Sequence, residues 1–423
     1  MISTRLDRLT TAFSRAVTRI GFWELFAIAL AMRLPLVIMR PPAELSENLN
    51  AGLTLARHGF LGDPFCLPTG PTAHVAPAYP ALVALVRVLT PSDAVCLRLL
   101  SLILAVVSSC NIAALIPVAR RLGLPRGSGL VAAAIWLIPL FPWIEFSARH
   151  ETPLTVAALL AFVTLMTRTV QQPAPTAGSA ARLGLLTGVA AYCTPTVLPV
   201  AVCTFFAGCP WRQWRLSGVL KVTAIAGIAF AIVVAPYTVR NHQALGAWFF
   251  MRDNLGIELA MSNGPGTQAV ADDNFTVLNQ QHPFVSKTAA LEVRQLGEVA
   301  FNHRLQERAL GWIRTHPGAF LSLTLKRAGY LVLPKSARWY QSVIASLVSL
   351  AAIGGAVLLW RSPYRLGVRC LAAALFGYLW IYLLVQHDIR YLYPALLLES
   401  LLGASLAVVM LGRFARPATP AAA

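Results

Sequence analysis

The sequence carries little charge. Only 12% of its 423 residues are Asp, Glu, Lys or Arg, whereas 57% are hydrophobic. A soluble globular protein carries about twice that charged fraction. Several apolar runs approach the roughly 20 residues that a membrane-spanning helix needs. The scarcity of charge therefore excludes a soluble globular protein and indicates a polytopic membrane protein.

Lysine is nearly absent and occurs only at positions 221, 287, 326 and 335. The formal net charge of +18 therefore comes mainly from arginine, which is spread over short loops between apolar runs. This distribution follows the positive-inside rule and is unlike a basic nucleic-acid groove. We expect those loops and both chain termini on the cytoplasmic side. The Arg-, Ala- and Pro-rich composition favours a bacterial source, and hence the bacterial cytoplasmic (inner) membrane.

Several common motifs are also missing. The seven cysteines form no CxxC pair and no zinc spacing. "SNGPG" at 262–266 lacks the Walker spacing and is interpreted as a turn, so no nucleotide site is predicted. No internal repeat is found, which argues against a two-halved transporter.

The apolar runs predict about ten membrane segments in an all-α fold. The fifth and sixth are short, and Pro195 and Pro199 interrupt the helix between them, so we expect a V-shaped pair that does not fully cross. The expected segments are 21–39, 95–118, 128–146, 152–168, 183–194, 197–208, 217–236, 340–360, 366–385 and 391–412.

This topology divides the chain into regions. Amphipathic helices such as 291–313 and 317–333 are expected to cap the bundle outside the cytoplasm, and 80–89 is expected to lie in the membrane interface. The regions are an N-terminal transmembrane part (1–236) with a first outer loop (41–92), an extracytoplasmic part (237–338), a C-terminal transmembrane part (339–412) and a cytoplasmic tail (413–423).

The polar clusters all fall on the outer side of this topology. They offer carboxylates, which can act as general bases on a hydroxyl, and arginines, which bind phosphate through two parallel hydrogen bonds. A lipid with a phosphate at the interface, such as a polyprenyl-phosphate sugar, would satisfy both. The clusters are "ELSEN" (44–48), "SARHET" (147–152), "YCTPT" (192–196), "YTVRNH" (237–242) and "QHDIRY" (386–391).

Six stretches in order carry a resemblance to a known superfamily. They are "ENLNAGLTLARHGF" with "TGPTAHVAPAYPALVALV", "HETPLTVAALLAF", "GLLTGVAAYCTPTVLP", "APYTVRNHQALGAWFFMRDNLGIELAMSNGPG", "LGEVAFNHRLQERALGWIRTHPGAF" and "HDIRYLYPALLLE". The chain resembles the GT-C integral membrane glycosyltransferases, which include the protein O-mannosyltransferases and the lipid A aminoarabinose transferase. It is most similar to a bacterial branch.

The resemblance implies transfer of a monosaccharide from a polyprenyl-phosphate donor to an envelope glycan, lipid or protein, on the periplasmic or outer face of the membrane. It implies an acidic catalytic residue in the first outer loop, which maps onto Glu47, with Glu44 as its rival. Many relatives have Asp there, whereas this chain has Glu. The implied substrate-binding residues are Glu151, His150, Arg240, Asn241, Arg252, Asp388, Arg390, Tyr391 and His74.

Other interpretations stay open. Charges at helix ends are common at the lipid headgroup level, and a lone histidine there is more often a surface residue than a ligand. No HxxxH or HxH pair supports zinc, and a divalent metal ion is left open as a cofactor. The alternatives to a transferase are a polyprenyl-lipid flippase or transporter, and a noncatalytic protein of envelope assembly.

Overall fold

A computed structural model describes residues 20–39, 46–138 and 151–414. Regular structure in these ranges is α-helical apart from two 3-10 turns. Two isolated bridges, Gly62 with Pro71 and Val270 with His387, are the only β pairings within the described ranges. The predicted all-α class is confirmed.

Seven described helices are long and apolar enough to cross a membrane, so the predicted polytopic membrane protein is confirmed in kind. They coincide with seven of the ten expected segments. These helices are α2 (Phe22–Met39), α5 (Asp93–Arg121), α8 (Thr152–Val170), α11 (Leu216–Leu245), α17 (Trp339–Leu359), α18 with turn η2 (Arg365–Leu379 and Trp380–Leu383) and α19 (Ile389–Phe414).

The other three expected segments are shorter helices. α9 (Ala177–Cys193) and α10 (Val197–Gly208) are separated near Pro195, as predicted. At 1.5 Å per residue α10 is only about 18 Å long, too short to cross about 30 Å of hydrocarbon. α6 (Ser128–Trp136) covers the start of the expected 128–146 segment. Residues 139–146 of that segment lie outside the described ranges.

Close helix contacts hold the bundle together. A Cβ on Gly184 of α9 would collide with the carbonyl of Ala226 in α11, and one on Gly355 of α17 would collide with the carbonyl of Leu402 in α19. Small residues at these positions let the helix backbones touch, which favours packing in lipid.

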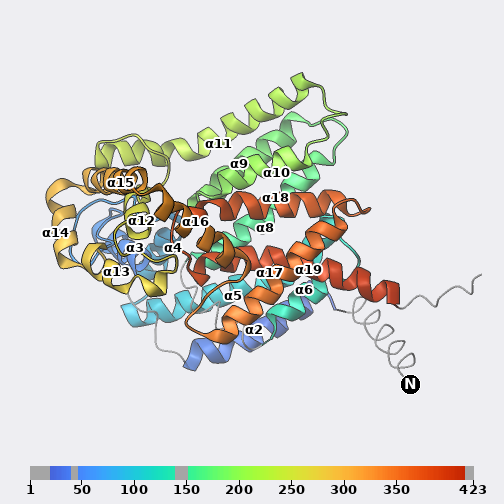
Figure 1. Ribbon diagram of the computed structural model, residues 1–423, viewed down its shortest axis with the longest axis horizontal. Helices are drawn as coiled ribbons and strands as arrows, with labels where there is room; N and C mark the ends of the chain where they lie inside the picture. Colours follow the sequence, from blue (N-terminus) through green and yellow to red (C-terminus); the bar gives the residue numbers. More distant parts are fainter. Residues whose placement is uncertain (1–19, 40–45, 139–150, 415–423) are drawn as a thin grey trace, which may run out of the picture.

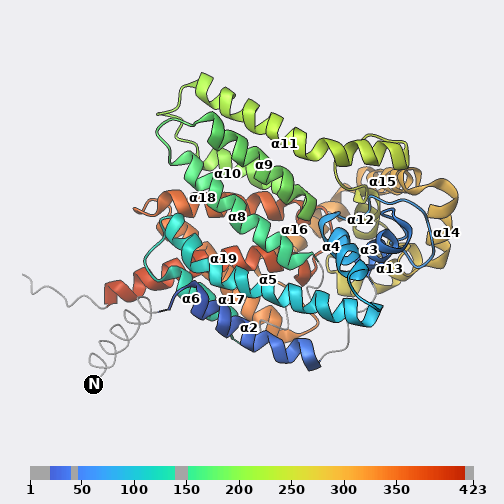
Figure 2. The same ribbon diagram turned by 180° about the vertical axis from the view of Figure 1, so that it is seen from behind.

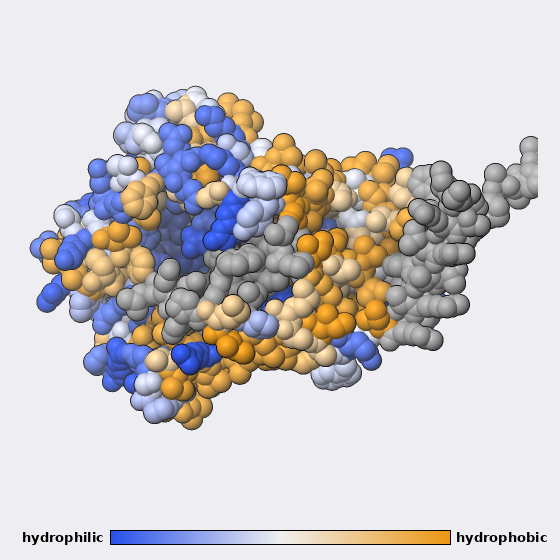
Figure 3. Space-filling view, turned by 90° about the horizontal axis from the view of Figure 1, so that it is seen from below, coloured by the Kyte–Doolittle hydropathy of each residue, from blue (hydrophilic) through white to orange (hydrophobic). Residues whose placement is uncertain are grey.

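The remaining helices gather at one end of the bundle, as Figures 1 and 2 show from opposite sides. Figure 3 shows an apolar bundle surface beside a much more polar end. The elements at this end are α3 (Glu47–His58), α4 (Ala78–Val88), α12 (Leu255–Ser262), η1 (Ala271–Asp273), α13 (Phe275–Gln281), α14 (Lys287–Leu296), α15 (Glu298–Thr315) and α16 (Pro317–Val332).

Two element boundaries differ from the prediction. The expected helix 291–313 is split into α14 and α15 by Gly297, whose φ of +82° is a conformation that favours glycine. α11 continues past residue 236 to Leu245, so Arg240 and Asn241 lie on a helix and not in a loop. Pro236 lies inside α11 and does not end it.

Candidate functional site

Glu47 is the first residue of α3, and the Ser46 side chain caps this helix by accepting a hydrogen bond from the Leu49 N–H. An acidic residue in a first turn suits the helix dipole. Its Oε1 lies 3.1 Å from Nε2 of His74 and 3.6 Å from Nε2 of His282. The Glu47 carboxylate is thus held between two imidazoles from distant parts of the chain.

The charges of this cluster are coupled. Burial would raise the pKa of Glu47, but the facing His74 and His282 imidazoles outweigh it and lower the pKa to about 2. Burial lowers the pKa of His74, yet the neighbouring Glu47 carboxylate gives a net increase. Burial dominates at His282 and lowers its pKa. Glu47 is therefore ionised at neutral pH.

The same three side chains could hold a metal ion. One ligand atom from each of Glu47, His74 and His282 lies within 4.8 Å of the others. Two imidazoles and a carboxylate are a usual donor set for a catalytic zinc site with an open position. The Glu47 Oε1 atom is buried and forms no hydrogen bond that meets standard geometry among the described residues, which fits a ligand role.

Sequence reasoning identified Glu47 and His74 but missed His282. Residues 47, 74 and 282 are so far apart in sequence that no motif spacing could connect them. Two further histidines of the polar clusters, His242 and His387, do not join this group of three. His242 stacks on Trp248 at 4.1 Å, and the buried His387 contacts the Lys335 carbonyl.

Two predicted arginines contact the backbone of the outer loops. Arg240 donates from Nη1 to the Thr72 carbonyl and from Nη2 to the Leu61 carbonyl, each at 2.7 Å. Its guanidinium is thus committed to protein carbonyls. Arg252 donates from Nε to the His74 carbonyl at 2.8 Å, and its charge also acts on the Glu47 carboxylate.

Asn241 and Glu151 also lie in this region. Asn241 is fully buried and accepts a hydrogen bond from Arg240 at 3.2 Å. Glu151 accepts a hydrogen bond from Asn48, the second residue of α3, at 2.8 Å. Burial raises the pKa of Glu151. The Glu151 carboxyl thus lies beside the helix that presents Glu47.

Arg390 lies in the first turn of the last membrane helix, α19, and is held by Asp388. Its Nε and Nη2 donate to Asp388 Oδ2 at 2.8 and 2.6 Å, while 53% of its side-chain surface is exposed. The guanidinium lies 6.0 Å from the centre of the Tyr391 ring, which stacks on Tyr382 at 5.1 Å. Burial raises the pKa of Glu151, and the charge of Arg390 opposes part of that increase, so these two groups share one electrostatic environment.

The corner before Arg390 is fixed from outside the membrane helices. His387 pairs through its backbone with Ala269 and Ala271. The buried Arg327 of α16 donates to the Leu384 carbonyl at 3.0 Å and to the Ser262 carbonyl. No sequence pattern predicts the bridge between Val270 and His387, because it pairs a single residue of each segment.

The structure therefore brings together Glu47, His74, Glu151, Arg252 and Arg390, with Asp388 and Tyr391 beside Arg390. Arg240 and Asn241 support the loops around them. Glu44 and His150 lie outside the described residues.

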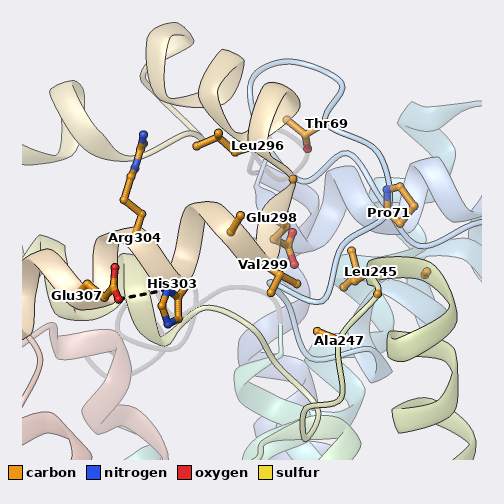
Figure 4. Close-up of a pocket in the computed structure, with 14 residues that line it drawn as sticks. Thr69, Pro71, Leu245, Ala247, Leu296, Glu298, Val299, His303, Arg304 and Glu307 are labelled. Carbon is orange, nitrogen blue, oxygen red and sulfur yellow. Dashed lines mark ion pairs between the residues drawn. The ribbon is translucent and has the colours of Figure 1, made fainter.

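A separate pocket of about 600 Å³ lies on the outer end, between α11 and α15. Figure 4 shows the Glu298 side chain between α15 and the loop that carries Pro71. His303 and Glu307 form an ion pair at 3.7 Å on the same wall. No residue predicted from the sequence lines this pocket.

Comparisons with known proteins give one distant likeness to report. No family model matches the chain, and no curated protein matches it. A solved structure that is similar is that of ArnT from Cupriavidus metallidurans bound to undecaprenyl phosphate. Its sequence is 14% identical to this one, and the match covers 94% of this chain and 77% of the ArnT chain, with a TM-score of 0.32. At that TM-score the likeness carries no argument about residues or activity.

Proposed function

We propose that this protein is a membrane glycosyltransferase that moves a monosaccharide from a polyprenyl-phosphate donor to an envelope glycan, lipid or protein. The observation that carries the proposal is the Glu47 carboxylate, ionised and held by two imidazoles. The charge of Arg252 acts on this carboxylate. Glu151 lies nearby, and the charge of Arg390 acts on the Glu151 carboxyl. The proposed site faces the outer side of the membrane.

Arg390 would bind the donor phosphate. It lies in the first turn of a membrane helix, where the phosphate of a lipid substrate would lie. Asp388 occupies Nε and Nη2, and Nη1 has no hydrogen-bond partner among the described residues. A guanidinium presents five N–H donors in a rigid plane, so the exposed side remains available to phosphate oxygens. Arg252 would add a second positive charge as the phosphate leaves. Arg240 is left out of this role, because carbonyl groups occupy both of its terminal nitrogens.

Glu47 would accept the proton of the acceptor hydroxyl as that oxygen attacks the anomeric carbon. A pKa of about 2 keeps the carboxylate ionised but weakens it as a base. An acceptor hydroxyl that displaced the more distant His282 imidazole, 3.6 Å from the carboxylate, would remove part of this effect and raise the basicity. Glu151 would accept a hydrogen bond from a substrate hydroxyl.

A divalent cation would fit at Glu47, His74 and His282. When bound there, it would lower the pKa of a hydroxyl as a Lewis acid. The residues themselves would orient that hydroxyl, because the carboxylate and both imidazoles converge on one point.

The alternative function, a transporter, predicts polar groups deep in the bundle. Glu399 lies well inside α19, but it accepts a hydrogen bond from Ser349 of α17 at 2.7 Å. This closed contact between two helices fits packing better than a path for a substrate.

The test is sugar transfer by the purified protein in lipid, given a panel of polyprenyl-phosphate monosaccharides and envelope lipid extract. The proposal expects donor-dependent release of polyprenyl phosphate by the wild type, lost in Glu47→Gln. Glu292→Gln, an exposed outer carboxylate paired with Arg304, is the matched control. Binding of a polyprenyl lipid without turnover of any donor would favour the flippase or the noncatalytic protein.

A further inference from the structure

The segment that carries His74 has no helix or strand to fix it. Thr72, Ala73 and His74 are nevertheless buried to 1% exposure or less. All six of their backbone N–H and C=O groups are hydrogen-bonded. A buried loop can be stable only if such groups find partners, so these partners determine where the His74 ring lies.

Charged side chains from three elements supply half of those partners. Arg240 of α11 binds the Thr72 carbonyl, and Arg252 binds the His74 carbonyl. Glu298, the first residue of α15, accepts from the Ala73 N–H at 2.7 Å and also from the Thr72 hydroxyl. That hydroxyl accepts in turn from the His74 N–H at 3.0 Å. Glu298 therefore binds the Ala73 N–H directly and the His74 N–H through the Thr72 hydroxyl.

Glu298 is itself fixed in place. Its side chain is 5% exposed, at the edge of the outer pocket. Asn302, one turn later on α15, donates to the carbonyl of Asp253 at 2.9 Å, and the Asp253 N–H donates to the Ala73 carbonyl at 2.9 Å. α15 therefore holds the 72–74 segment by hydrogen bonds, directly from Glu298 and indirectly from Asn302 through Asp253.

We propose that Glu298 is a positioning residue for the transfer reaction, which holds the 72–74 segment so that the His74 imidazole stays against the Glu47 carboxylate. It acts through His74 and forms no hydrogen bond or ion pair with Glu47 among the described contacts. This inference rests on the proposed function, because it assigns Glu298 to the same site.

Three variants test it kinetically. Glu298→Ala removes both acceptors and is expected to lower kcat roughly 10- to 100-fold, since small misplacements of a site can cost that much. The donor KM should change less than about twofold, because Arg390 is untouched. Glu298→Gln keeps an acceptor for Ala73 and should recover most of the rate. Glu307→Ala is the matched control, because Glu307 lines the same pocket wall and its one ion pair among the described residues is with His303.

A double mutant shows whether the effect passes through His74. In a His74→Gln background, Glu298→Ala should lower kcat no further, because coupled residues are not additive. An undiminished second loss, or a loss in Glu307→Ala as large as in Glu298→Ala, would overturn the proposal.

A second readout does not need activity. Diethyl pyrocarbonate modifies accessible imidazoles, and mass spectrometry locates the adduct. His74 should be protected in the wild type, Glu298→Gln and Glu307→Ala, and modified in Glu298→Ala. Equal protection in all four would contradict the inference. If the wild type transferred no sugar while this pattern held, the proposed function would fail and the control of His74 by Glu298 would stand.

Discussion

The Glu47 site depends on side chains that only the folded chain brings together. The sequence could predict Glu47, which belongs to the polar cluster at 44–48, and the resemblance to the GT-C superfamily added His74 of the same loop. The sequence could not predict His282, which follows α13, because no spacing rule connects that residue to the first loop. Asp388 is different, because it lies two residues before Arg390 in the same polar cluster, so a role in orienting Arg390 could be expected; the structure shows the Asp388 carboxylate accepting two hydrogen bonds from the guanidinium.

Arg390 provides a prediction about the donor. Arg390→Ala is expected to raise the donor KM roughly tenfold or more, because a charge-assisted contact with phosphate is lost. Arg390→Lys should recover only part of the affinity, since an ammonium lacks the planar set of donors. The measurement is the donor KM of each variant in lipid. Equal KM values for all three proteins would remove Arg390 from the phosphate site.

Glu298 also predicts how stability depends on pH. Burial raises its pKa to about 7 in the folded protein, from about 4.5 when unfolded. Between these values the folded state binds more protons, so stability should fall as pH rises from about 4.5 to about 7. Thermal unfolding in detergent should show this decline for the wild type and a shallower one for Glu298→Gln. An equally steep decline in the variant would show that another group is responsible.

At the scale of elements, the length of the apolar runs and the interruptions between them predicted the helices most reliably. Seven of the ten predicted membrane segments are long helices, and the predicted interruption near Pro195 separates α9 from α10. Sequence reasoning misjudged α11, which continues through Pro236, and it missed the division at Gly297. Local preference cannot settle such positions, because neighbouring helices decide whether a helix continues or turns.

The packing of α12 on α15 allows a direct test. A Cβ on Gly256 would collide with the carbonyl of Asn302, so Gly256→Ala should destabilise the protein by about 1–3 kcal/mol. Gly264→Ala is the control, because its nearest neighbours lie at 3.7 and 3.8 Å, ordinary contact distances. Thermal unfolding should show a clear loss for the first variant only. Equal stability of the two variants would contradict this contact.

At the scale of the whole molecule, the arrangement agrees with the asymmetry of polar residues in the sequence. The helices that carry the candidate site lie at one end of the bundle (Figure 1). The short loops 171–176, 209–215 and 360–364 lie at the opposite end, and the last two carry arginines. That the arginine-bearing end faces the cytoplasm stays a prediction from the positive-inside rule.

Cys66 offers a natural probe of this orientation, because it is exposed in the first outer loop. A membrane-impermeant maleimide should label it in bacterial cells whose outer membrane has been permeabilised and whose inner membrane is intact. Cys66→Ser should remove that label. Labelling that required rupture of the inner membrane would place the site on the cytoplasmic side.

The central claim is that Glu47 serves sugar transfer from a polyprenyl-phosphate donor. Its most direct test is the rate of polyprenyl-phosphate release by the wild type and by Glu47→Gln in lipid, with unfolding temperatures measured for both. The account predicts release by the wild type and a loss of about 100-fold or more in the variant at similar stability. A well-folded Glu47→Gln that released polyprenyl phosphate at the wild-type rate would contradict it.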